Sequence, residues 1–253
     1  MKKTFVLWTR LFISPTEGFS DLTPQTPIIL PVLSIVVLVL AGMLMLMPII
    51  GSETYTEALG RVQINTLAER GTEMSAEQLE VMQEQLHSGR MRTFTMLSST
   101  VGGAFTFFLM LLVNTLFLLI LTRIFGSKPS FKHLFKILVF LAAVSSIQAI
   151  IKNGITLMSD YERLLSRVQY AKDMQWAITS PVSLAVLFAP GKLSILLYTL
   201  IDSITDIFNW IYFIYLYFAM RFSLSLPGNK AIGITILAAA LMIGISLIFA
   251  SIV

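Results

Sequence analysis

Two aspartates four residues apart, Asp202 and Asp206, are the strongest candidates for chemistry in this chain. Side chains at this spacing share one face of a helix. The segment that carries them, IDSITDIFNW, leads into the apolar and aromatic run IYFIYLYFAM. An ionisable side chain inside a membrane-spanning helix marks an ion, proton or substrate site by default. An aspartate at a helix start can instead cap that helix at the membrane surface.

The choice between these roles depends on where the lipid begins. If residues 193–220 form one span, both carboxylates lie about 14–20 Å inside it. Each would then cost roughly 2.5–3.5 kcal/mol to insert. If the span begins near Leu200, both lie at the outer headgroups and Asp206 caps the next helix. We favour the second interpretation because it satisfies both carboxylates without a ligand, with Lys152 or Arg92 as the expected counter-ion.

A functional version of this site is a proton, cation or lipid-headgroup site at the outer mouth of the protein. Its candidate polar residues are Asp202, Asp206, Asn209, Asn114 and Lys152. No third acid accompanies the aspartates, so we expect no metal site. The chain has no cysteine and no phosphate-binding or hydrolase motif. We therefore expect no catalytic residue, no cofactor and no enzymatic activity.

The composition indicates a membrane protein. The 253 residues are 56% hydrophobic and only 13% charged, with a mean hydropathy of +0.81. Soluble domains carry about 25% charged residues. The net charge of +4 does not indicate nucleic-acid binding, because basic and aromatic residues form no recognisable binding motif.

Apolar segments predict an all-α polytopic fold with five transmembrane helices. The expected spans are 28–51, 93–122, 137–151, 193–222 with a preceding interfacial part, and 231–253. The third span is short, so we expect its flanking Lys136 and Lys152 to snorkel outward. No interrupted helix is evident, which argues against a transporter.

Two polar insertions, 52–92 and 152–192, are predicted to be amphipathic and helical. Ser75 with Gln78 and Ser159 with Glu162 resemble capping boxes, and Gly89 is a plausible helix stop. Both insertions follow odd-numbered spans and so emerge on the same side. Because one apolar stripe is unstable alone in water, we expect the insertions to pack on each other or on a second copy.

Basic residues are concentrated in the N-terminal segment 1–27, the loop 123–136 and the turn 223–230. The positive-inside rule then predicts a cytoplasmic N-terminus, with the insertions and the C-terminus extracytoplasmic. The N-terminal segment reads as an amphipathic helix that lies on anionic lipid or packs on the protein itself. The candidate anionic-lipid contacts are Lys2, Lys3, Arg10, Arg123, Lys128, Lys132 and Lys136.

Small residues in two spans have the spacing of helix-packing motifs. They are Gly102 and Gly103 in the second span and Ala240 with Gly244 in the fifth. They predict either close packing within the chain or a dimer seam.

Three stretches, 13–33, 125–142 and 206–232, resemble the Yip family in order and content. The first has a Pro, a Phe and further prolines before a span, the second has GSKPSF, and the third has Trp210 and Lys230-Ala231. The resemblance implies five spans, a cytoplasmic N-terminus and no agreed catalytic activity. The chain lacks the long N-terminal region of the eukaryotic relatives. The resemblance therefore implies a bacterial inner-membrane protein, for which we expect no GTPase binding.

The resulting functional hypothesis is a non-enzymatic accessory or scaffolding subunit. Its expected partners are the bilayer and either a second copy or another membrane complex, such as an ABC-type exporter. The alternative is a transporter or lipid-moving protein that uses Asp202 and Asp206.

Overall fold

A computed structural model describes residues 2–69, 75, 89–169, 173–174, 183–188 and 194–252. Every regular element in these ranges is a helix, which confirms the predicted all-α class. The elements are α1 (Lys2–Ile13), α2 (Pro15–Ser20), α3 (Ile29–Ile50), α4 (Glu53–Glu69), α6 (Gly89–Ile124), α7 (Phe131–Met158), α8 (Tyr161–Ser166), η1 (Leu184–Leu187), α10 (Ile195–Thr205), α11 (Ile207–Phe218), the π-helical η2 (Ala219–Ser223) and α12 (Gly228–Ile252).

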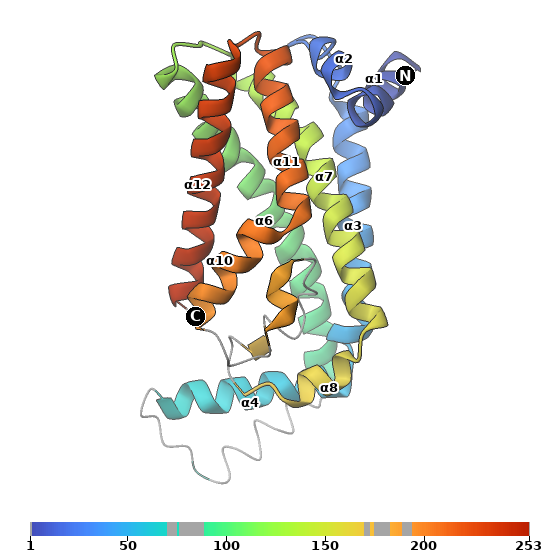
Figure 1. Ribbon diagram of the computed structural model, residues 1–253. Helices are drawn as coiled ribbons and strands as arrows, with labels where there is room; N and C mark the ends of the chain where they lie inside the picture. The colour runs from blue at the N-terminus through green and yellow to red at the C-terminus, as the bar shows by residue number, and fades with distance from the viewer. Residues whose placement is uncertain are drawn as a thin grey trace.

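Long helices run side by side to form the bundle (Figure 1). Four of them, α3, α6, α7 and α12, are long and apolar enough to cross a membrane. The fourth predicted span is divided between α10 and α11. The bundle is therefore polytopic as predicted, but its fourth segment is not one continuous helix.

Helix α7 forms the centre of the bundle, where α3, α6 and α11 pack against it. Its buried apolar side chains dominate the main core; they include Leu134, Ile137, Leu138, Leu141 and Ala143. The helix extends beyond the expected span 137–151 at both ends.

The two lysines that flank this span do not snorkel outward. Lys136 is buried, and its ammonium group donates to the carbonyls of Pro24 (2.5 Å) and Thr26. Lys152 turns toward Asp206 instead. The snorkelling prediction is wrong because both ammonium groups find acceptors inside the protein.

Parts of the two polar insertions meet at one end of the bundle, as expected. We call α4 and α8 together the platform, and the opposite end, where α1 and α2 lie, the N-terminal end (Figure 1). A small core joins the platform to the end of α3; its buried members are Ile49, Ala58, Leu165, Val168 and Met174. The side chain of Arg61 on α4 donates to the carbonyls of Val168 (3.0 Å) and Leu165 (2.8 Å).

The helix ends in the insertions differ from the predicted ones. Asp160, not Ser159, caps α8, because its carboxylate accepts from the backbone N–H of Arg163 at 3.3 Å. Ser159 instead follows the end of α7. Gly89 is helical and is the first described residue of α6, so it is not a helix stop. The expected capping box at 75–78 lies outside the described residues, apart from Ser75 itself.

Helices α1 and α2 pack on the rest of the protein. Of the two alternatives for the N-terminal segment, contact with anionic lipid or packing on the protein itself, the structure shows the packing. Leu7 and Leu11 are buried, and the Trp8 ring lies 4.8 Å from that of Phe140, centroid to centroid. The two helices approach closely at Gly18, where a Cβ would lie 2.7 Å from the backbone of Leu11. Only glycine fits this contact without a shift of the chain.

Replacement of Arg61 by Met is expected to loosen the platform. The variant leaves two buried carbonyls without their charged donor, a loss of about 2 kcal/mol. This should lower the melting temperature of the detergent-solubilised protein by about 4–8 °C. The matched control is Arg163→Met on α8, where the side chain is exposed. Equal melting temperatures for the two variants would contradict the role of Arg61.

Candidate functional site

A single residue, Asp206, interrupts the fourth segment. Its backbone is extended (φ −68°, ψ 116°), so α10 ends before it and α11 begins after it. One carboxylate oxygen accepts from the N–H of Phe208 at 2.8 Å, and its own N–H donates to the carbonyl of Asp202 at 2.9 Å. The prediction that Asp206 caps the following helix is confirmed.

The second carboxylate oxygen of Asp206 binds two donors from α7. Lys152 forms an ion pair with it, and the amide of Gln148 donates to it at 3.0 Å. Asp206 is 1% exposed and the side chain of Lys152 is 16% exposed. The expected pairing with Lys152 is confirmed, while the side chain of Arg92 lies outside the described residues.

A third helix joins this polar layer. The residue after Lys152, Asn153, donates from its amide to the carbonyl of Gly42 on α3 at 2.7 Å. A Cβ on Gly42 would meet Ile150 of α7 at 3.5 Å, so the two helices lie close together here. The polar layer therefore links α3, α7 and α11 inside an apolar bundle.

Asp202 belongs to a separate contact. It is half-buried and accepts from the hydroxyl of Ser183 at 2.5 Å. One turn earlier on α10, the hydroxyl of Tyr198 is buried with no hydrogen-bond partner among the described residues. The two aspartates thus do not converge on one ligand site, although they lie four residues apart.

The break also frees carbonyl groups at the end of α10, and side chains of α11 satisfy two of them. Asn209 donates to the carbonyl of Ser203 at 3.0 Å, and the indole N–H of Trp210 donates to that of Ile204 at 2.7 Å. Asn209 therefore stabilises the break rather than facing a groove.

The break lies part-way along the bundle. Helix α10 packs beside α12, between Asp206 and the platform end (Figure 1). From the break, α11 and η2 rise about 25 Å toward the N-terminal end. The depth of the pair relative to the headgroups stays a prediction.

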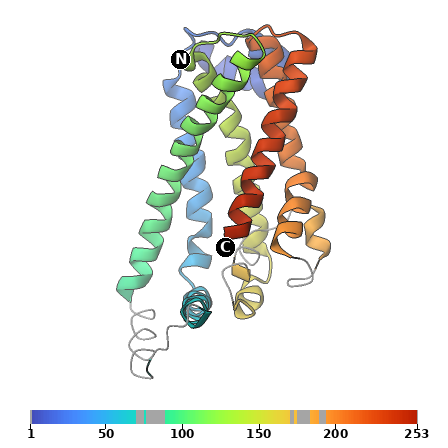
Figure 2. The same ribbon diagram turned by 90° about the vertical axis from the view of Figure 1, so that its left-hand side faces the viewer.

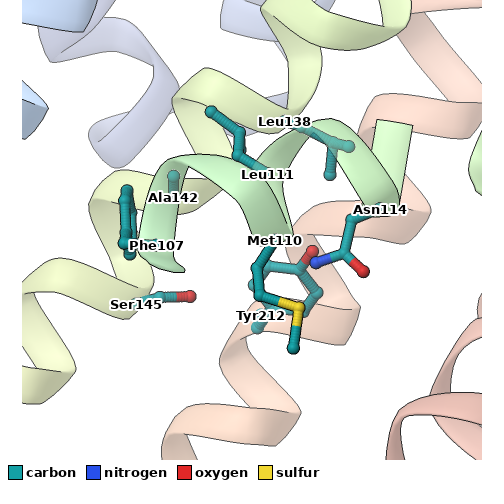
Figure 3. A pocket seen from close by; sticks show the side chains of 8 residues that line it. All are labelled: Phe107, Met110, Leu111, Asn114, Leu138, Ala142, Ser145 and Tyr212. Atoms are coloured by element: carbon teal, nitrogen blue, oxygen red, sulfur yellow. The ribbon is translucent and has the colours of Figure 1, made fainter. Parts of the chain in front are cut away.

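Asn114 lies apart from both aspartates. It lines a pocket between α6, α7 and α11 together with Ser145 and Tyr212 (Figure 3). Sequence reasoning missed Gln148, although its four-residue spacing from Lys152 in an otherwise apolar segment is a readable signal.

Two of the candidate lipid-binding cations, Lys136 and Arg10, have partners within the protein. Lys136 is buried against two carbonyls, so its assignment as a lipid contact is wrong. Arg10 forms an ion pair with Asp21 at 3.0 Å. The candidates Arg123, Lys128 and Lys132 are exposed, and lipid contact stays a prediction for them and for Arg10, which is also exposed. The side chains of Lys2 and Lys3 lie outside the description.

The small residues divide between two environments. A Cβ on Gly103 would lie 2.6 Å from the end of Met43, so this glycine serves packing between α6 and α3. A Cβ on Gly102 or Gly244 would meet nothing within 4 Å, and Ala240 is exposed.

A family model described as the Yip1 domain matches residues 9–250. No curated protein and no solved structure matches the chain.

Disruption of the ion pair is expected to destabilise the protein strongly. Asp206→Asn keeps a capping oxygen but leaves the Lys152 charge buried without a counter-ion, a cost of about 3–5 kcal/mol. The double variant Lys152→Met/Asp206→Asn removes both charges and should recover most of this loss. Thermal unfolding in lipid nanodiscs measures both, with Asp202→Asn as the control. Additive losses in the double variant would contradict a coupled pair.

Proposed function

The chain belongs to the Yip1 domain family, and from that premise we propose that it is a non-enzymatic accessory or scaffolding subunit of a membrane assembly. The family model covers nearly the whole chain, so the membrane bundle itself is the family's common unit. The partner is a second copy of this chain or another membrane complex, such as an ABC-type exporter. The proposed setting is a bacterial inner membrane, with the N-terminal end cytoplasmic and the platform outside.

An exposed stripe of small residues on α6 carries this proposal. Ser98, Gly102 and Thr106 follow at intervals of four, and all three are exposed. Small residues at this spacing let two membrane helices approach closely enough for backbone contacts. The space beside Gly102 is open in one copy, so a second helix can enter without displacing any side chain.

Helix α12 offers a second surface of the same kind through Ala240 and Gly244. Figure 2 shows α6 leaning away from α12 toward the platform end. The half of α6 that carries the small residues is therefore accessible from the side. Both surfaces support association within the membrane.

Replacement of Gly102 by Leu is expected to weaken this association at least tenfold. A leucine side chain keeps the helices apart, while the single copy has room for it. Fluorescence energy transfer between labelled copies in liposomes measures self-association, and co-purification after mild extraction measures other partners.

The matched control is Val101→Leu, at an exposed position on a neighbouring face of α6. It adds bulk without entering the small-residue stripe. If wild type stays monomeric and co-purifies with no membrane protein, the scaffolding proposal fails. If Gly102→Leu and Val101→Leu behave alike, the association uses another surface.

A second candidate function, transport, is favoured by the interrupted fourth segment. Sequence reasoning found no interrupted helix, and the break at Asp206 corrects that expectation. Discontinuous helices with ionisable residues occur at the substrate and coupling-ion sites of secondary transporters. The polar layer at Lys152 and Asp206 would then move a proton or a cation.

Proteoliposomes loaded with a pH-sensitive dye test this second function. Under an imposed membrane potential, wild type should move protons faster than empty liposomes. The variant Lys152→Met/Asp206→Asn should abolish the difference, since it lacks both ionisable groups but retains a neutral, capped break. Equal fluxes for wild type and the variant would mean that the pair is structural only.

A further inference from the structure

A pocket of about 80 Å³ lies between α6, α7 and α11 (Figure 3). Its apolar lining consists of Phe107, Met110, Leu111, Leu138 and Ala142. Its polar lining consists of the amide of Asn114 and the hydroxyls of Ser145 and Tyr212. The pocket contains neither aspartate and is separate from the polar layer around Asp206.

The three polar side chains of the pocket, Asn114, Ser145 and Tyr212, have no hydrogen-bond partner among the described residues. Neighbouring hydroxyls in the same helices are satisfied: Thr115, Thr122 and Ser146 each donate to a carbonyl one turn earlier. Among the described residues, only the hydroxyl of Tyr198 is both fully enclosed and unpaired, so the three polar groups here are open to the pocket. Because an unpaired polar group in hydrocarbon is costly, they favour a bound molecule at this place.

The depth of the pocket restricts what that molecule can be. Along their helices, Asn114 lies about 15 Å from the last residue of α6, and Tyr212 lies about 17 Å from the end of η2. In a hydrocarbon core about 30 Å thick, both lie near its middle. Ionised headgroups stay at the surface, because a charge at this depth is expensive. Only an uncharged polar group is compatible with the pocket.

The pocket opens toward the side of the bundle. Met110, at its rim, is 41% exposed, and Asn114 is half-buried. At this height the spans are surrounded by lipid chains, so the entry route is lateral. The apolar part of its lining is compatible with an apolar chain.

We propose that this pocket binds a neutral lipid whose polar group is an uncharged hydroxyl or carbonyl. The Asn114 amide can both donate to and accept from such a group. The hydroxyls of Tyr212 and Ser145 supply further donors. This site requires neither the association surface on α6 nor the ion pair, and it stands if either proposed function fails.

Photolabelling in nanodiscs tests the site with a long-chain alcohol that carries a photoactivatable group on its chain. The label should attach to peptides of α6 and α11 and should be displaced by unlabelled alcohol. Asn114→Leu and Tyr212→Phe should each weaken this displacement about three- to tenfold, the effect of one lost hydrogen bond.

Matched controls separate the pocket from general effects on the bundle. Ser145→Ala removes a pocket hydroxyl, whereas Ser146→Ala removes a neighbouring hydroxyl that is bound within its own helix. Tyr217→Phe is the control for Tyr212→Phe, since Tyr217 does not line the pocket. Unchanged elution profiles establish that each variant is folded.

Three results would overturn the proposal. The first is equal displacement by a phosphatidylglycerol of the same chain length, which would make the labelled surface ordinary annular lipid. The second is equal affinity of the pocket variants and their controls. The third is the absence of displaceable labelling in wild type. The pocket would then hold only water, since its volume is large enough for several water molecules.

Discussion

The ion pair between Lys152 and Asp206 is the constraint on which the arrangement of the bundle depends. Apolar helix faces in lipid give little preference for one relative height over another, since lipid tails are as apolar as leucine. A buried ammonium group needs its counter-ion at one particular level. Asp206 supplies it only if α11 starts beside that level of α7, and the neighbouring Asn153 fixes α3 through Gly42 in the same way. The apolar contacts then complete a packing that the polar layer has aligned.

Polar contacts also fix the chain at the N-terminal end, where two lysines donate to backbone carbonyls. Lys136 holds the chain between α2 and α3, and Lys230 donates to Phe125 at 2.8 Å between α6 and α7. His133 bonds Ser223 at 2.8 Å, which ties η2 to α7. Charge counting treats Lys136 and Lys230 as surface cations. Their neighbours show that some of the basic residues hold loops in place and are not available to lipid.

Sequence reasoning succeeded where one physical requirement acts on a local segment. The thickness of the hydrocarbon core predicts the long apolar helices. The free N–H groups at the start of a helix need acceptors, which predicts the cap at Asp206. It failed where the outcome depends on which helix lies opposite. Lys136 was assigned to lipid because its acceptors come from a segment more than 100 residues away, at Pro24. The missed Gln148 and the separation of Asn114 from Asp206 have the same cause, since spacing along one helix does not specify its neighbour.

One face of α7 carries both kinds of polar group in the bundle. Ser145, Gln148 and Lys152 follow at intervals of three and four, so they line the same side of the helix. Toward the platform, Gln148 and Lys152 both bind the carboxylate of Asp206 on the neighbouring helix. Polar groups that pair across two helices in this way align them. Toward the middle of the bundle, Ser145 makes no hydrogen bond among the described residues. An unpaired hydroxyl of this kind can bind a molecule from outside the protein. Helix α11 contributes both Asp206 to the ion pair and Tyr212 to the pocket, which lie six residues apart. Alignment and the proposed binding therefore use the same two helices, α7 and α11, but through different side chains.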